Sequence, residues 1–148
     1  MTAEESLSNA ENLLARLEQA RTRLEDTDDP DKAIEIRLNA EDPEHDFRPS
    51  PGRIEHFRPP EGPGVRVDTF VESGAVIPPY YDSMIAKVIV WDTDRPAAVA
   101  RAERALRETV VDGVPTTRDL ALEVLASEQF RSGDYSTSTL DALRSVAA

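Results

Sequence analysis

One stretch, residues 33–52, constrains the fold more than any other part of this sequence. It begins with a strict alternation of polar and apolar side chains, whose apolar members are Ile34, Ile36, Leu38 and Ala40. A period of two places each set of side chains on its own face of a β-strand. The alternation is followed by strong turn signals, Asp42-Pro43 and Pro49-Ser50-Pro51-Gly52. We therefore expect a half-buried strand with Arg37 in the middle of its polar face, and then a loop.

Four later segments predict further short strands, separated by turns rich in proline and glycine. They are Arg53–Arg58, Val65–Val71, Gly74–Ile77 and Met84–Trp91. The last is an almost continuous apolar run interrupted by Lys87, which is typical of a central strand buried on both faces. We interpret Lys87 as structural, because a lysine in such a strand must reach a partner or solvent. The pattern favours a small antiparallel sheet or an open barrel.

The remaining residues have the spacing of helices. Caps are predicted, in chain order, at one of Asp92, Thr93 and Asp94, at Thr116 or Thr117, and at Ser136–Ser138. Pro96 suits the first turn of the first helix, whose buried stripe is predicted to be Val99, Ala102, Leu106 and Val110. Val110-Val111 is then expected to return to the sheet. Strands first and helices last predict an α+β fold.

Residues 3–26 predict a separate amphipathic helix. Its leucines recur at heptad-like spacing with Glu and Arg between them, and Asp28-Asp29-Pro30 ends it. Periodicity leaves two alternatives open, a helical hairpin or coiled-coil partner and a helix that folds back onto the following domain. We divide the chain into an N-terminal helix with its linker, residues 1–32, and a domain over residues 33–148.

Composition excludes several classes of function. The 148-residue chain has a formal charge of −12 and no cysteine, which excludes disulfides, thiolate catalysis and cysteine-ligated metal. The acidic balance argues against a nucleic-acid surface, because phosphate binding relies on clustered cations. No run approaches the roughly 18 apolar residues of a membrane span, and the N-terminus lacks the basic, apolar character of a signal peptide. We expect a cytoplasmic protein that contacts neither membrane nor nucleic acid.

The sequence lacks the residue spacing of metal-binding, nucleophile and phosphate-binding motifs. The acidic residues between 41 and 46 fit neither an EF-hand nor a zinc motif, so a solvated loop is expected there. The histidines are His45 and His56, and neither lies in a nucleophile motif. The six glycines form no phosphate-binding loop. These patterns predict no metal centre and no nucleotide site within the chain.

Four blocks of the sequence occur together and in one order: IEIRLNAEDP, FRPSPGRI, GVRVD and PPYYDSMIAKVIV. They resemble the C-terminal domain of biotin carboxylases, the ATP-dependent subunits or domains of acetyl-, propionyl- and pyruvate-type carboxylases. The resemblance covers residues 33–143 and ends where the family would have its large ATP-grasp region. Residues 10–35 also bear a faint resemblance to the helical small subunit of exonuclease VII. The chain therefore has the pattern of a fusion, a degenerate gene or a gene-calling artefact.

The resemblance implies roles for individual residues. Arg37 matches the active-site arginine that the family uses to stabilise the biotin enolate during carboxyl transfer. Tyr81 and Asp82 match a loop near the biotin pocket and the dimer face. Arg66 and Glu108 match positions of the subunit interface. The residue types alone favour plainer roles, in which these side chains pack, cap or lie on the surface.

Two local details bear on these assignments. Taken as a residue type alone, Arg37 is expected to pair with Glu35 or Asn39 on its own strand face. Pro63 stands where many relatives have an aromatic residue in the interface, which weakens the expectation of a homodimer.

Three hypotheses of function follow from the resemblance. In the first, the chain is a fragment or split subunit that takes part in ATP-dependent carboxylation of biotin on a carrier protein. ATP and Mg²⁺ would then act only through a partner ATP-grasp region, and an acyl-CoA carboxylase of fatty acid biosynthesis or a pyruvate carboxylase would use the product. In the second, the chain is a catalytically inactive interaction or dimerisation module. In the third, its N-terminal helix makes it an accessory subunit of a nuclease.

Overall fold

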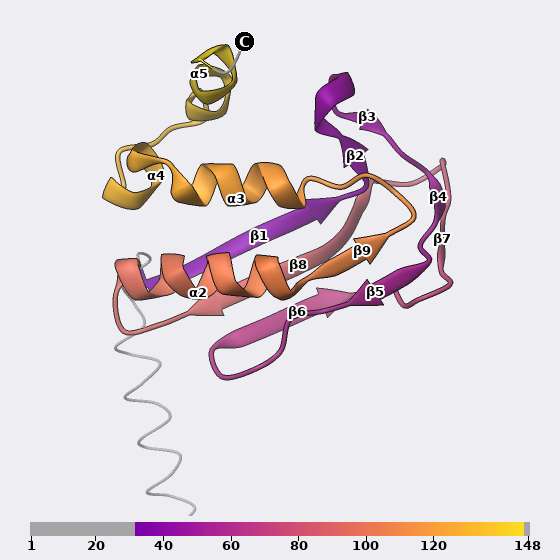
Figure 1. The fold of residues 1–148 in the computed structure, drawn as a ribbon, viewed down its shortest axis with the longest axis horizontal. Coiled ribbons are helices and arrows are strands. Elements are labelled where there is room, and N and C mark those ends of the chain that lie inside the picture. Colours follow the sequence, from indigo (N-terminus) through magenta and orange to yellow (C-terminus); the bar gives the residue numbers. More distant parts are fainter. Residues whose placement is uncertain (1–31, 147–148) are drawn as a thin grey trace, which may run out of the picture.

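The computed structural model describes residues 32–146 as a mixed α+β domain (Figure 1). The N-terminal part contains the strands β1 (Ala33–Asn39), β2 (Glu41–Asp42), β3 (Arg48–Pro49), β4 (Gly52–Arg53), β5 (His56–Arg58), β6 (Val65–Thr69), β7 (Val76–Ile77) and β8 (Met84–Trp91), with the short 3₁₀ helix η2 (Pro43–His45) after β2. The C-terminal part contains α2 (Arg95–Glu108), β9 (Val110–Asp112), α3 (Arg118–Ala126), α4 (Glu128–Ser132) and α5 (Thr139–Val146). The predicted α+β class is confirmed. The helix predicted over residues 3–26 lies outside the described residues.

The centre of the domain is a three-stranded antiparallel sheet in the order β1-β8-β6. In β1, Ile34 and Leu38 are buried while Glu35 and Arg37 are exposed, so the alternation predicted for this strand is confirmed. Across the sheet, the buried side chains Ile34 and Leu38 lie opposite Val90 and Ala86 of β8. This apolar face of the sheet is one wall of the core.

Strand β8 is central, as its apolar sequence predicts, and the prediction that both its faces are buried holds only in part. Ala86, Val88 and Val90 are buried on the core face. On the opposite face Ile85 is buried, but Lys87 is half-buried and Trp91 retains 42% of its exposure. The difference arises because the neighbouring strands carry charged side chains on this face, and charges keep contact with water.

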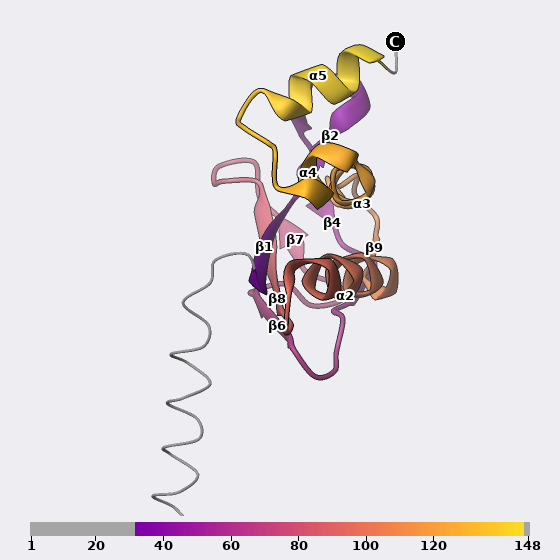
Figure 2. The ribbon, with the colours of Figure 1, turned by 90° about the vertical axis from the view of Figure 1, so that its left-hand side faces the viewer.

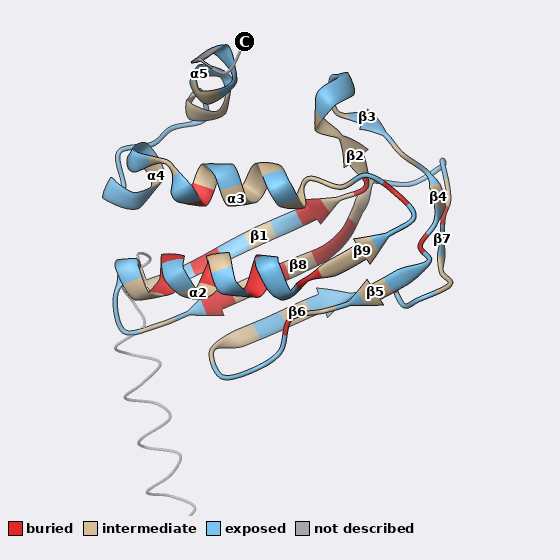
Figure 3. Cartoon of the chain, in the orientation of Figure 1, coloured by how far each residue is buried: buried red, intermediate tan, exposed pale blue. Residues whose placement is uncertain are grey.

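Helices α2 and α3 lie on one side of this sheet (Figure 2). The buried residues of α2 are mostly small, which lets the helix axis approach the strands, and they are Ala98, Val99, Ala102, Ala105 and Leu106. Figure 3 shows the buried positions concentrated where α2 faces β1 and β8. The N-cap of α2 is Asp94, whose side chain accepts a hydrogen bond of 2.8 Å from the backbone N–H of Ala97.

Two differences from the predicted elements lie outside the central sheet. The single strand expected over residues 53–58 is instead two strands, because the chain changes partner at the fully buried Ile54: β4 pairs with β7, and β5 pairs with β9. Val110 belongs to β9, so it lies beyond the buried stripe of α2. Strand β9 returns to β5 and not to the central sheet.

The N-terminus of α3 is tied to the end of β1. The side chain of the N-cap residue Thr117 makes no hydrogen bond to its own helix, and its Oγ1 instead accepts one of 3.1 Å from the backbone N–H of Asn39. The backbone N–H of Thr117 in turn donates to the carbonyl of Asn39 at 3.1 Å. These bonds fix the point at which β1 ends, two residues beyond Arg37.

Candidate functional site

Arg37 lies near the middle of β1, on the face of the sheet that points away from the helices. Its side chain is 66% exposed, and its Nε donates a hydrogen bond of 3.3 Å to Oε1 of Glu35. The pair forms because residues two apart on a strand lie on the same face. The two terminal amines of Arg37 make no hydrogen bond within residues 32–146. The guanidinium is therefore held by its inner edge, and its outer edge is available to a ligand.

Lys87 of β8 is the cross-strand neighbour of Arg37 in the register of the sheet. Its Nζ lies 3.6 Å from Oε1 of Glu35, so one carboxylate oxygen contacts both cations. The expectation that this lysine reaches a partner is confirmed. The side chains of Glu35 and Lys87 are 41% and 33% exposed, which places this cluster at the protein surface.

Strand β6 adds a second ion pair to the same face. Asp68 lies opposite Lys87 in the register and accepts two hydrogen bonds from Arg66, of 2.8 and 2.9 Å. The hydrogen bonds from Arg66 lower the pKa of Asp68, and the charge of Lys87 acts in the same direction. The same hydrogen bonds raise the pKa of Arg66. We call Glu35, Arg37, Arg66, Asp68 and Lys87 the outer-face cluster.

Tyr81 and Asp82 lie in the loop between β7 and β8. Tyr81 is 81% exposed, and Oδ1 of Asp82 accepts a hydrogen bond of 2.7 Å from the backbone N–H of Met84. This loop reaches the end of β1, where the backbone N–H of Ala40 donates to the carbonyl of Ser83 at 2.7 Å. No hydrogen bond or ion pair joins Tyr81 or Asp82 to Arg37 among the described residues. The loop is thus bonded to the end of β1 but not to the arginine side chain.

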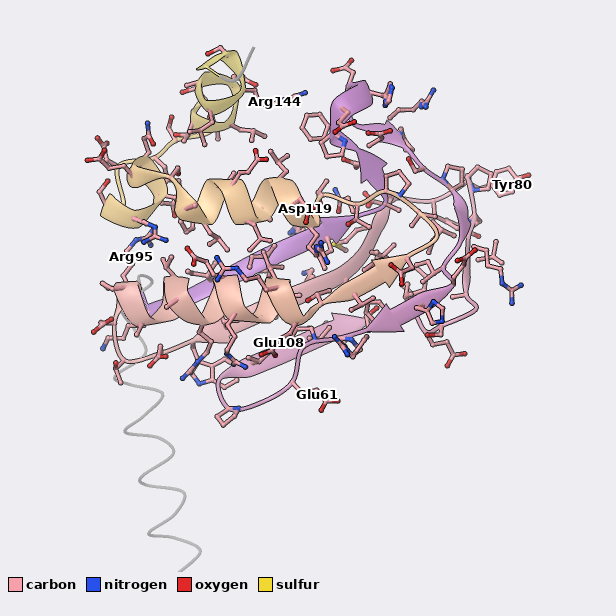
Figure 4. The ribbon with its side chains drawn as sticks, viewed as in Figure 1. Glu61, Tyr80, Arg95, Glu108, Asp119 and Arg144 are labelled. Carbon is pink, nitrogen blue, oxygen red and sulfur yellow. The ribbon has the colours of Figure 1, made fainter. Side chains whose placement is uncertain are left out.

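Glu108 lies at the end of α2 and pairs with Arg104 one turn earlier, at 3.2 Å (Figure 4). Its partner on the described surface is thus a residue of its own helix. Arg66 belongs to the outer-face cluster, and no hydrogen bond or ion pair connects it with Glu108 in the part of the chain that the structure describes. The two predicted interface residues therefore make no direct polar contact with each other in this range.

A groove of about 670 Å³ lies between α3 and α5, where Figure 4 labels Asp119 and Arg144. Arg144 closes one end, since it donates a hydrogen bond of 2.9 Å to the carbonyl of Pro43 and stacks 4.6 Å from the centroid of the Phe47 ring. The groove combines apolar lining residues, among them Leu120 and Leu143, with acidic side chains at its rim.

Hydrogen bonds among its own residues organise the acidic loop after β1. Asp42 accepts a hydrogen bond of 3.1 Å from the backbone N–H of Glu44 and pairs with Nδ1 of His45 at 2.7 Å. The hydrogen bond with His45 lowers the pKa of Asp42. Within residues 32–146 no group of three or more His, Asp or Glu side chains is placed to hold a metal ion. None of the helices in this range is long and apolar enough to cross a bilayer.

Sequence reasoning did not predict the ion pair between Lys87 and Glu35. The alternation of β1 places Glu35 beside Arg37, but the pairing of β1 with a strand some fifty residues later decides that Lys87 joins them. The usable signal was a single charge in an otherwise apolar strand, since such a charge needs a partner.

Comparisons with known proteins agree with this architecture. Residues 35–142 match the family model of the biotin carboxylase C-terminal domain. The biotin carboxylase of Nostoc sp. is 55% identical over 106 residues, which are 72% of this chain and 24% of that protein. A biotin carboxylase of Bacillus subtilis is 51% identical over 109 residues, which are 74% of this chain and 24% of that protein.

Solved structures give the same result. The biotin carboxylase domain of the Hydrogenobacter thermophilus 2-oxoglutarate carboxylase, a dimer in complex with MgADP, ADP and bicarbonate, aligns with a TM-score of 0.75 at 41% identity. The alignment covers 78% of this chain and 26% of that one. The chain thus spans about a quarter of the length of the relatives it matches. From the family match and these identities, the chain belongs to the biotin carboxylase C-terminal domain family.

Proposed function

We propose that this chain forms the C-terminal part of a biotin carboxylase active site and that Arg37 is its catalytic residue. The observation that carries the proposal is the position of Arg37 within the matched region, with its inner edge on Glu35 and its terminal amines turned to solvent. A guanidinium stays charged at any working pH and directs several donors at an oxygen that gains negative charge. Carboxylation of biotin places such charge on the urea oxygen of biotin.

Biotin on a carrier protein fits this site as a substrate, because the exposed guanidinium is accessible to a bulky partner. The described residues offer no site for Mg²⁺, since they lack a cluster of metal-binding side chains. The proposal therefore assigns nucleotide and metal chemistry to an ATP-grasp partner or to another part of a longer protein. Its partners are that ATP-grasp portion and the biotin carboxyl carrier protein.

The other predicted residues take supporting roles in this proposal. Tyr81 and Asp82 contact biotin or the carrier from the loop at the end of β1, where the exposure of Tyr81 leaves it free to do so. Arg66 and Glu108 belong to a homodimer interface, an arrangement that the dimeric Hydrogenobacter thermophilus relative supports by analogy. The acceptor of the carboxyl group, an acyl-CoA or a keto acid such as pyruvate, belongs to a different domain of these systems.

The test is ATP cleavage that depends on bicarbonate and biotin. The purified chain is assayed alone and mixed with a separately expressed ATP-grasp portion of a related biotin carboxylase. Activity is expected only in the mixture, and Arg37→Ala is expected to lower it by about 10²- to 10³-fold. Arg107→Ala is the matched control, since Arg107 is an exposed arginine on α2 that pairs with Glu103. Full activity with Arg37→Ala would refute the catalytic role.

A catalytically inactive dimerisation module is the second candidate function. It is favoured by the ion pair between Arg66 and Asp68 on the edge strand of the sheet, which presents opposite charges to a second copy. Light scattering distinguishes the two candidates. If the protein is a folded dimer and the mixture shows no ATP cleavage, the result favours the inactive dimerisation module.

A further inference from the structure

The loop of residues 78–83, which connects β7 to β8, is joined to the end of β1 through Ser83. The carbonyl of Ser83 accepts a hydrogen bond of 2.7 Å from the backbone N–H of Ala40, and its hydroxyl donates one to Oε1 of Glu41. The tip of the loop contributes little packing, because Tyr80 and Tyr81 are 87% and 81% exposed, and Figure 4 shows Tyr80 pointing away from the domain. The position of the loop therefore depends on polar contacts at its base.

Glu41 also contacts the end of β1. The oxygen that receives the Ser83 hydroxyl accepts a second hydrogen bond, of 3.1 Å, from Nδ2 of Asn39. The backbone of Asn39 is fixed in turn by two hydrogen bonds of 3.1 Å with Thr117. One carboxylate oxygen thus bridges a fixed strand end and the base of the loop. We call Asn39, Glu41 and Ser83 the loop clamp.

The orientation of the Asn39 amide depends on this carboxylate. Its Oδ1 is buried and accepts no hydrogen bond within residues 32–146. Turning the amide over would bring this oxygen against the carboxylate of Glu41, and two acceptors repel each other. The charge of Glu41 therefore fixes the amide. It also strengthens both bonds, because a hydrogen bond to a charged group is about twice as strong as one between neutral groups.

From these contacts we infer that Glu41 is a positioning residue for the loop 78–83, and that it holds Tyr81 and Asp82 beside the end of β1. The inference rests on the proposed function, because these two residues are proposed there to contact biotin or its carrier. Glu41 is half-buried and bonds to the loop through Ser83, so it acts on the substrate only through the loop. A glutamine at this position would keep an acceptor oxygen, whereas an alanine would release both donors.

The first measurement is NMR on the full chain without a partner. Glu41→Ala is expected to lower the heteronuclear NOE of the Tyr81 and Asp82 amides, because the loop loses its clamp. Exchange of the Ala40 amide is expected to become about tenfold faster, the factor for losing a hydrogen bond to a charged group. Ser83→Ala is expected to reproduce both changes. Glu41→Gln and Ser83→Thr keep an acceptor and a donor, so they are expected to retain most of the wild-type order.

Two controls separate a local effect from a general loss of stability. Glu44→Ala removes the same type of side chain three residues later, from the exposed helix η2, and is expected to change none of these quantities. The amide of the fully buried Ile54 donates to the carbonyl of Ala75 at 2.9 Å, outside the central sheet. Its exchange is expected to stay constant in Glu41→Ala. Equal acceleration at Ala40 and Ile54 would mean that the whole domain opens more often, and it would overturn a role confined to the loop.

The second measurement uses the mixture with the ATP-grasp portion and free biotin as substrate. A residue that positions a substrate-binding loop changes the KM for biotin more than it changes kcat. Glu41→Ala is expected to raise this KM about tenfold, in step with the exchange rate, and to change kcat by less than about threefold. Glu41→Gln is expected to restore the wild-type KM. An unchanged KM in Glu41→Ala, with a raised KM in Tyr81→Ala, would contradict the positioning role.

The two measurements can fail separately. Unchanged NOE values and an unchanged exchange rate in Glu41→Ala would overturn the inference, whatever the activity of the mixture. A mixture without activity would instead refute the proposed function. In that case the NMR measurements still decide whether Glu41 positions the loop.

Discussion

Leu38 and Arg37 are neighbours in β1 with opposite surroundings, so replacing each by alanine should affect stability very differently. Leu38 is fully buried against the core, so Leu38→Ala removes buried methyl groups and leaves a cavity in a packed interior. Such a change costs about 2–5 kcal/mol of unfolding free energy. Arg37 is largely exposed, so Arg37→Ala is expected to change stability by no more than about 0.5 kcal/mol.

The assay is urea unfolding followed by circular dichroism, with thermal unfolding as a second measure. For a domain of this size the loss in Leu38→Ala corresponds to a decrease of about 10 °C or more in Tm. The m-value should stay constant, since both variants unfold from the same fold. If Arg37→Ala lost as much stability as Leu38→Ala, the assignment of the two faces of β1 would be wrong. A loss of carboxylation in Arg37→Ala would then result from unfolding and would say nothing of a catalytic role.

Two further predictions concern other parts of the domain. The pKa of Asp68 is lowered in the folded state, so its contribution to stability is present above its ordinary pKa of about 3.9 and is lost as the pH falls through the lower folded value. Asp68→Asn should therefore reduce the acid sensitivity of unfolding below about pH 4, and identical acid unfolding curves would contradict this. Gly113→Ala should destabilise the domain, because φ is +108° and a Cβ would lie 2.2 Å from the carbonyl oxygen of Arg53. Gly133→Ala is its control, with φ of +83° but no heavy atom closer than 3.9 Å, and equal losses in urea unfolding would refute the steric argument.

Much of the fold was predictable because it depends on local patterns. The alternation in β1, the apolar run of β8 and the cap at Asp94 each reflect side chains within a few residues of one another. The change of partner at Ile54 was not predictable in the same way. There the backbone N–H of Ile54 bonds to Ala75 and that of Glu55 to Asp112, and no periodicity within residues 53–58 encodes these distant partners.

In the candidate site, too, the features set by local sequence were predictable and those set by distant strand pairing were not. The position of Arg37 on a polar strand face followed from the alternation of its neighbours, and its pairing with Glu35 is the plainer alternative that the residue types suggested. The roles of Tyr81, Asp82, Arg66 and Glu108 came from the resemblance and remain predictions. The shared carboxylate between Arg37 and Lys87 depends on strand register, which pairs residues about fifty positions apart.

The order of the strands in the sheet also determines the order in which the domain can fold. Both edge strands, β1 and β6, precede the central strand β8 in the sequence, and they pair with β8 and not with each other. During synthesis they have no partner until Trp91 has left the ribosome, and their hydrogen-bonding groups stay open to other chains. The sheet therefore cannot assemble before β8 is available to pair with both strands. Nascent chains that stop before Met84 therefore carry two unpaired strands and are the species most exposed to aggregation.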